Sequence, residues 1–501
     1  MLFNASKEIV KTDTQKTAAQ HHNEFDDLID MDDIFGYNQY LKKPDGKPQE
    51  PLTQADLDPF FEPGNKRRSY DLQYVSDLRL DPSLRVGGQG ENHFLYRWDG
   101  SFWERLSEST SKRKAWNWLK QFAPKNATAR NATALHQASL FELEMLPAAP
   151  TVNLVPLKDY WLIIRDGGDL EIQKPCRDWG VTYQVNAQLG GNQSGHYQPA
   201  PLPADSHFFR FLQMSLPNED ERRLVQEYCG YTLLNDVRFQ VAQIWVGDGC
   251  NGKSVLLKVI ERLHSTVGSI RLDQLSGFGL APLVDASLIL CSEAPKRGLD
   301  EQTLKQIISG DPVAVEYKFG DMFMYSPFAK FLIACNRFPH ISDDSNGVWR
   351  RLQIVRWGVN LTREQQIANL DQIIVANELK LVVDWCLEGL SRLLKRGEFV
   401  EPVSVKLRKD AEKVHSNNVL AFVDDYELDV GNAFIPKERV YEKYAAYCES
   451  SGLNPFHGVE FWKRMVQRFP GMAEQRRSIQ GKRLRVVSLS FGNAQQEGGS
   501  V

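Results

Sequence analysis

Residues 241–264 read VAQIWVGDGCNGKSVLLKVIERLH: a short apolar run, a glycine-rich loop and a segment with helical spacing, in that order. The loop at 247–254 matches G-x-x-x-x-G-K-[ST], in the strand–loop–helix context that this phosphate-binding motif requires. Glycines let backbone N–H groups turn toward phosphate oxygens, and the N-terminus of the following helix adds partial positive charge. These residues therefore predict a nucleotide-binding α/β fold, with a chance glycine-rich turn as the alternative.

The chemistry of phosphate binding predicts a role for individual residues of the loop. We expect Lys253 to reach the β- and γ-phosphates of ATP and Ser254 to supply an oxygen ligand to Mg²⁺. Cys250 stands at a position whose side chain the motif leaves unconstrained. The residues expected to surround the nucleotide are Gly247, Asp248, Gly249, Cys250, Asn251, Gly252, Lys253, Ser254 and Val255.

Three further apolar runs follow the loop, SLILCS (287–292), FAKFLIAC (328–335) and RLQIVRW (351–357). Short apolar runs that alternate with helical segments predict a parallel sheet with both faces covered. Polar residues come directly after two of these runs. We expect Glu293 to be the water-activating base and a metal-site carboxylate beside Ser292, with a helix-capping acid as the alternative. We expect Asn336 to sense the γ-phosphate, with a simple turn as the alternative.

Basic residues between and after these strands predict contacts with a neighbouring subunit and with nucleic acid. Arg351 suits an arginine finger that acts across a subunit boundary, and Arg350 is the alternative for this role. The other interpretation is that either arginine only forms ion pairs at the surface. Residues 313–327 read as a β-hairpin with a charged tip, whose Lys318, together with Lys305 before it, would track a nucleic-acid backbone. The alternative is that the interleaved aromatics Tyr317, Phe319 and Phe323 belong to the core.

Residues 434–492 read as two amphipathic helices followed by a basic two-stranded ribbon around Gly481. This layout predicts a winged-helix domain, which serves either DNA binding or protein packing. The last 71 residues carry 11 Lys/Arg against 6 Asp/Glu, so a local phosphate contact is plausible there. The candidate DNA-binding residues of this module are Lys463, Arg464, Arg476, Arg477, Lys482 and Arg483.

Composition bounds the rest of the chain. The 501 residues are 42% hydrophobic and 25% charged, as in globular proteins. No apolar run approaches the roughly 18 residues of a membrane span, the N-terminus lacks a secretory pattern, and the seven cysteines form no C-x-x-C pair. We therefore expect a cytoplasmic protein with no membrane contact, no zinc site and no disulfide framework. Residues 1–65 hold 13 Asp/Glu against 6 Lys/Arg and read as an acidic tail that could bind a partner.

Hairpins are expected at 94–106 and 157–172, a helix at 111–123, and two helices at 206–235, the second capped near Asn218. The expected fold class is α/β, with a P-loop core between other regions. The expected divisions are a tail at 1–75, an α+β region at 76–205, a helical segment at 206–236, the core at 237–360, a helical segment at 361–430, the winged-helix domain at 431–492 and a tail at 493–501.

The succession GDGCNGKS, LILCSE, LKQIISGDPVAVEYKF, LIACNRFP and WRRLQIV resembles superfamily 3 helicases. More narrowly, it is similar to the helicase part of phage, plasmid and satellite primase-helicases, a pattern that poxvirus primase-helicases share. The chain departs from these by having Ser292 where many P-loop enzymes have Asp, and by lacking a paired-carboxylate primase core upstream.

The resemblance implies an AAA+-like P-loop core at 237–360, preceded by a collar-like helical segment at 206–236. It further implies an ATP- and Mg²⁺-dependent replicative DNA helicase that forms a homo-hexameric ring and translocates on single-stranded or forked DNA. It also implies a phage or other mobile element as the source, and hence the cytoplasm of a bacterial host. Primer synthesis would then reside in a separate primase or other replication protein, reached through the acidic tail. One alternative is an ATP-driven replication initiator or DNA-remodelling motor with little unwinding. A more remote alternative is a P-loop small-molecule kinase.

Overall fold

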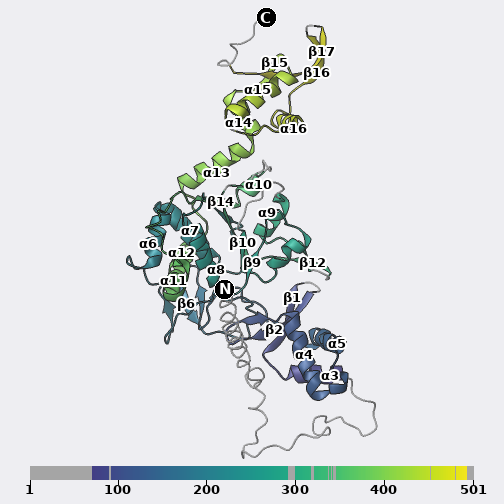
Figure 1. The fold of residues 1–501 in the computed structure, drawn as a ribbon, viewed down its shortest axis with the longest axis vertical. Coiled ribbons are helices and arrows are strands. Elements are labelled where there is room, and N and C mark those ends of the chain that lie inside the picture. Colours follow the sequence, from purple (N-terminus) through teal and green to yellow (C-terminus); the bar gives the residue numbers. More distant parts are fainter. Residues whose placement is uncertain are drawn as a thin grey trace, which may run out of the picture. The chain divides into compact units, whose positions relative to one another are not determined.

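The computed structural model describes residues 70–89, 92–291, 300–317, 321–336, 338–339, 341, 346–451, 453–479 and 481–492 (Figure 1). The expected acidic tail up to residue 69 and the expected tail at 493–501 lie outside these residues. Within the described ranges, no helix combines the length and the apolar character that crossing a membrane requires.

A five-stranded parallel sheet forms the core of the nucleotide-binding region. Its order confirms the parallel sheet that the apolar runs predicted. The additional edge strand β9 was not expected, because three residues are too few to show a periodicity. The strands lie in the order β14 (Leu352–Arg356), β8 (Ala242–Val246), β13 (Lys330–Cys335), β10 (Leu288–Cys291) and β9 (Val267–Ser269).

Both faces of this sheet are covered, as the sequence predicted. Successive residues of a strand point to opposite faces, so Trp245 enters one core while its neighbour Ile244 enters the other. The first core also holds the apolar face of α8 (Lys253–Leu263), and the second holds that of α9 (Glu301–Ser309). The second core further includes η3 (Gly277–Leu283) and residues of the short helix α10 (Asn346–Trp349).

Four helices from two distant parts of the sequence share the first core. They are α6 (His207–Ser215), α7 (Glu219–Tyr231), α11 (Leu370–Asn377) and α12 (Leu379–Arg396). Asn218 caps α7 as expected, its side chain accepting from the N–H groups of Asp220 and Glu221. Glycines let α7 and α12 approach closely, because a Cβ on Gly230 would lie 2.3 Å from the Cys386 carbonyl oxygen. The segments expected at 206–236 and 361–430 therefore pack together through α7 and α12.

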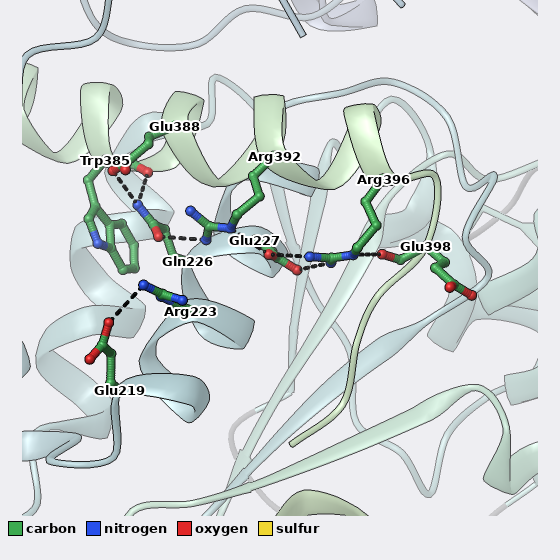
Figure 2. A network of polar contacts seen from close by, with 9 residues as sticks. All are labelled: Glu219, Arg223, Gln226, Glu227, Trp385, Glu388, Arg392, Arg396 and Glu398. Carbon is green, nitrogen blue, oxygen red and sulfur yellow. Dashed lines mark hydrogen bonds and ion pairs between the residues drawn. The ribbon is translucent and has the colours of Figure 1, made fainter. Parts of the chain in front are cut away.

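A buried carboxylate ties these two helices together (Figure 2). Glu227 on α7 is 3% exposed and accepts from Arg392 Nε at 2.7 Å and Arg396 Nη2 at 2.5 Å. Arg392 also donates to Gln226 Oε1 at 2.8 Å, and Gln226 in turn donates to the Trp385 carbonyl oxygen at 2.8 Å. Because the buried charge is paired and hydrogen-bonded, its desolvation is compensated and the helices are fixed in register.

The N-terminal region begins earlier than the sequence indicated. Helix α3 starts at Tyr70 and buries Tyr74 and Val75, so the boundary placed at residue 75 is wrong: the polar run before it masked the first apolar turn. The structure confirms the hairpins expected at 94–106 and 157–172 and the helix expected at 111–123. The further elements are β1 (Leu84–Gln89), β2 (Asn92–Trp98), β3 (Trp103–Arg105), α4 (Glu108–Phe122), η2 (Pro124–Asn126), α5 (Ala129–Glu142), β4 (Asn153–Pro156), β5 (Trp161–Ile164), β6 (Leu170–Gln173) and β7 (His196–Tyr197).

The C-terminal module has its own core. The two helices and basic ribbon expected at 434–492 are present, and they pack with a preceding helix, α14, whose Phe422 is fully buried. The boundary drawn at 431 is therefore wrong, because α14 already belongs to this core. After α13 (Val403–Ser416) the elements are α14 (Asn418–Asp425), β15 (Asp429–Pro436), α15 (Lys437–Ser450), α16 (Gly458–Arg468), β16 (Glu474–Ile479) and β17 (Lys482–Ser490), with the strands in the order β15-β17-β16.

Candidate nucleotide-binding site

The glycine-rich loop runs from the end of β8 to the start of α8. Gly252 has a left-handed backbone (φ 89°), and a Cβ there would lie 2.4 Å from Ser215 Oγ. At Gly247 a Cβ would lie 2.3 Å from the Trp357 carbonyl oxygen. The loop conformation therefore needs glycine at both positions, for backbone freedom and for close packing.

Hydrogen bonds hold this loop in place. Asn251, 2% exposed, donates from Nδ2 to the Trp357 carbonyl oxygen at 2.9 Å. Lys253 Nζ donates to the Gly247 carbonyl oxygen and, at 3.4 Å, to Asn251 Oδ1. The motif leaves position 251 open, so its anchoring role was not foreseen. The hydrogen bond of Asn251 links the loop to Trp357, the residue after β14.

The electrostatic environment of Lys253 suits an anion. Burial lowers the pKa of Lys253, and the nearby Cys335 and Asp248 only partly oppose this. Burial also raises the pKa of the Cys335 thiol to about 12, so this neighbour stays neutral at physiological pH. No ion pair joins Lys253 to a carboxylate among the described residues, so this buried ammonium would gain from a bound phosphate, which favours its charged form.

A cavity of about 370 Å³ opens at this loop, within the size range of small-ligand sites. It brings Asn336 together with the phosphate loop, of which residues 249–255 line the cavity and Gly247 and Asp248 do not. Asn336 follows β13, the neighbour of β8, and carboxyl ends of adjacent parallel strands meet at one edge of a sheet. Helix α8 directs its N-terminus at the same place. A larger cavity of about 940 Å³ contains none of the expected site residues.

Sequence reasoning missed part of the cavity wall. Phe211 and Met214 come from α6, while Leu361 and Gln365 come from the segment after β14. Leu361 is fixed to the loop, because its N–H donates to the Cys250 carbonyl oxygen at 3.0 Å. No spacing in the sequence links these residues to the loop, and only the packing of α6 and α11 beside α8 brings them there.

The residues present fit ATP with Mg²⁺. The glycine cradle, the buried cation and the helix N-terminus together form an anion site. The Ser254 hydroxyl is exposed in the cavity and has no hydrogen-bond partner among the described residues, so it is free to ligate a metal. Glu293, the expected base and second metal-site residue, lies outside the described residues, as does Ser292.

The two expected arginines have different surroundings. Arg351 is bound within its own chain: Nε donates to Ser309 Oγ at 2.8 Å and Nη1 to the Gly347 carbonyl oxygen at 2.7 Å. Arg350 is exposed, has no partner among the described residues and lines a separate cavity of about 480 Å³. The preference for Arg351 as a finger therefore conflicts with its geometry, since its guanidinium is already engaged.

The hairpin expected after α9 is present as β11 (Val313–Glu316) and β12 (Met322–Tyr325). Its Phe323 is buried in the core, so the alternative interpretation holds for this aromatic residue. Lys318 and Phe319, which the sequence places between these two strands, lie outside the described residues. Lys305 is half-buried on α9.

Most of the expected C-terminal cations are exposed. Arg476 on β16 lies opposite Arg485 on β17, and Arg485 is paired with Glu474 at 4.0 Å. Arg464 is the exception: it is 6% exposed, bonded to Glu460 at 2.9 Å and stacked on the Phe456 ring. Its assignment as a phosphate contact is wrong, because it faces the core of the module. The exposed candidates are Lys463, Arg476, Arg477, Lys482 and Arg483.

Comparison with known proteins supports the resemblance seen in the motifs. Residues 245–351 match a family of unknown function (DUF5906), and residues 414–482 match the family described as Poxvirus D5 protein-like. "Putative helicase 184R" of Invertebrate iridescent virus 6 is 26% identical over 135 residues, 24% of this chain and 14% of that protein. "Putative helicase L207/L206" of Acanthamoeba polyphaga mimivirus is 25% identical over 178 residues, 32% of this chain and 18% of that protein. These matches confirm the resemblance to the superfamily 3, primase-helicase-like proteins.

The chain matches less than a fifth of the length of either viral relative. An apo structure of the NrS-1 C-terminal region covers 83% of this chain and 99% of its own, with 13% identity and a TM-score of 0.43. A second apo structure of that region covers 84% of this chain and 100% of its own, with 12% identity and a TM-score of 0.44.

Proposed function

We propose that this chain is an ATP-dependent replicative DNA helicase of superfamily 3, which translocates on single-stranded DNA as a homo-hexameric ring. One observation carries the proposal: Lys253, Ser254 and Asn336 line a single cavity at the carboxyl edge of a parallel sheet. The similarity to two viral proteins named as helicases directs this nucleotide site toward DNA rather than toward a small-molecule acceptor.

The residues of the cavity divide the work of ATP hydrolysis. Lys253 binds the β- and γ-phosphates, and the N–H groups at the start of α8 bind the remaining oxygens. Asn336 orients the attacking water at the γ-phosphate, and Glu293 accepts its proton. Ser254 and Glu293 would hold Mg²⁺, which would supply neutralisation of the phosphate charge.

The cavity lacks an arginine: none lines it in the part of the chain that the structure describes. We assign the missing positive charge to Arg350 of a neighbouring subunit in the ring, because Arg350 is exposed and uncommitted whereas Arg351 is engaged inside its own chain. Hydrolysis would then require an assembled interface, which couples neighbouring subunits.

DNA contacts are assigned to two places. Lys318, which follows β11 in the sequence, and Lys305 on α9 would contact the strand inside the ring. The C-terminal module would act as a winged helix, with the ribbon β16–β17 and Lys463 on α16 against phosphates. The exposure of Arg476, Arg477, Lys482 and Arg483 on this ribbon supports the proposal.

The proposed setting is replication of a phage, plasmid or satellite element in the cytoplasm of a bacterial host. The acidic N-terminal residues would recruit a separate primase or other replication protein, because acidic, apolar-poor segments bind partners without forming a core of their own. A pull-down with residues 1–69 deleted from the chain tests this part by itself.

Strand displacement on a forked DNA tests the main proposal. We expect wild type to separate the strands with ATP and Mg²⁺, and Lys253→Ala to retain DNA binding while losing both hydrolysis and unwinding. Hydrolysis by wild type that neither responds to DNA nor separates strands would reject the helicase and favour the initiator or kinase alternative. Gel filtration with a non-hydrolysable ATP analogue then tells these apart, because a kinase stays monomeric.

A further inference from the structure

An irregular segment between β14 and α11, residues 361–369, forms one wall of the nucleotide cavity. The Leu361 N–H donates to the Cys250 carbonyl oxygen at 3.0 Å, which holds the start of the segment on the phosphate loop. Asp371, just after the segment, pairs with Lys258 on α8 at 3.6 Å, which holds its end. The wall therefore extends from the loop along the first turns of α8.

Apolar side chains on this wall and on α6 suit the faces of a nucleobase. Ile367 lines the cavity and is 44% exposed, although large apolar side chains are usually buried. Phe211 and Met214 line the cavity from α6. A flat aromatic ring bound there would remove part of this apolar surface from water. The polar side chains of the same wall are then left to contact the edge of the ring.

Two glutamine amides line the cavity, and the main chain of their own turn fixes the orientation of each. Gln366 Nε2 donates to the Leu361 carbonyl oxygen at 2.9 Å. Gln365 Oε1 accepts from the Thr362 N–H at 3.0 Å. A main-chain carbonyl can meet only the nitrogen of an amide and a main-chain N–H only its oxygen, so neither amide can turn over without losing its bond.

These bonds leave one acceptor and one donor for a ligand. Among the residues that the structure describes, Gln366 Oε1 has no donor and Gln365 Nε2 has no acceptor. Adenine presents an amino group beside a ring nitrogen that accepts, which is the edge that a glutamine-type donor and acceptor pair. Guanine has O6 in place of the amino group, and this acceptor would meet the acceptor Gln366 Oε1. Because the amides are fixed, they cannot turn over to suit guanine.

We propose that these two side chains select adenine over guanine. Gln366 Oε1 accepts from the adenine amino group, and Gln365 Nε2 donates to the neighbouring ring nitrogen. This inference rests on the nucleotide site proposed above and adds the choice of base. The phosphate loop cannot supply that choice, because adenine and guanine nucleotides carry the same phosphates.

Displacement of ribose-labelled fluorescent ADP from the full chain, with Mg²⁺ present, tests the selection. The unlabelled competitors are ADP, GDP and purine riboside diphosphate, which lacks the amino group. We expect wild type to bind ADP about tenfold more tightly than GDP, at the lower end for a bidentate pair because water reaches both side chains. Purine riboside diphosphate should bind about fivefold more weakly than ADP.

Gln366→Met removes the acceptor, so we expect all three competitors to bind this variant within about twofold of one another. These are ratios within one protein, which a general loss of folded protein does not change. Gln365→Glu keeps the acceptor for the Thr362 N–H and removes only the free donor, so the Kd for ADP should rise about fivefold. The matched control Arg363→Gln shifts the charge of the same turn equally and does not line the cavity, so we expect its Kd within about twofold of wild type.

The outcomes separate this inference from the proposed function. If wild type binds none of the nucleotides, both fail. If wild type hydrolyses ATP and unwinds DNA but Gln366→Met keeps the wild-type preference for ADP over GDP, only this inference fails. Equal binding of ADP and GDP by wild type, or tighter binding of GDP, would also overturn it.

Discussion

Arg350 and Arg351 are neighbours in sequence, and the structure predicts opposite consequences for replacing them. Arg350→Ala removes an exposed side chain that has no partner among the described residues, so we expect the free energy of unfolding to change by no more than about 0.5 kcal/mol. Arg351→Ala breaks the hydrogen bonds to Ser309 and to the Gly347 carbonyl oxygen. At about 1 kcal/mol each for a side chain that water still reaches, the loss is about 2 kcal/mol.

Catalysis should show the reverse order. If Arg350 stabilises the transition state in the neighbouring subunit, Arg350→Ala lowers kcat for ATP by about 10³-fold, which corresponds to about 4 kcal/mol of barrier. Arg351→Ala should keep most of its activity wherever it remains folded. Lys406→Ala is the matched control, because Lys406 is an exposed cation that lines the same 480 Å³ cavity as Arg350.

Urea unfolding followed by tryptophan fluorescence, combined with steady-state hydrolysis, measures both effects. Mixing Arg350→Ala with Lys253→Ala subunits adds a test of action in trans, because some interfaces then join an intact Lys253 to an intact Arg350. Recovery of hydrolysis in the mixture supports the assignment. Wild-type kcat for Arg350→Ala, or lost kcat in a fully folded Arg351→Ala, would refute it.

Three other changes probe the fold and the loop. Gly252→Ala places a Cβ on a left-handed backbone, 2.4 Å from Ser215 Oγ, so we expect a loss of at least about 1–2 kcal/mol in the free energy of unfolding. We also expect weaker binding of a fluorescent ATP analogue. An unchanged binding titration would contradict the role of Gly252 in the phosphate loop. Glu227→Ala leaves two arginines unpaired and should cost about 3 kcal/mol in urea unfolding, whereas a loss below about 0.5 would show that the pairs contribute little. Burial, with a smaller effect of Lys330, lowers the pKa of His264 to about 3, so the unfolded chain binds the extra proton between about pH 3 and 6.5. As the pH is lowered through that window, the free energy of unfolding should therefore decrease by up to about 1.4 kcal/mol per pH unit. His264→Asn should flatten this dependence in thermal melts recorded at several pH values. The same dependence in wild type and variant would reject this role of His264.

The sequence by itself determined the local chemistry of the nucleotide site. Gly252 and Lys253 follow from the phosphate loop, because each is required by backbone geometry or charge within a few residues of the chain. The parallel sheet was equally predictable, since its buried strands are continuous apolar runs whose ends carry polar residues such as Asn336. These are properties of short segments, and short segments are what a sequence pattern records.

The tertiary structure decided what distant segments do together. Met214 and Gln365 are about 150 positions apart in the chain, and only the shared packing of α6 and α11 places both on the cavity wall. The choice between Arg350 and Arg351 depended on which guanidinium meets Ser309, a contact across 42 positions. Arg464 looked like its neighbour Lys463 until the helix was placed on its core. Burial and hydrogen bonding at a given residue depend on what the rest of the chain brings to it, and periodicity along one segment carries no information about that.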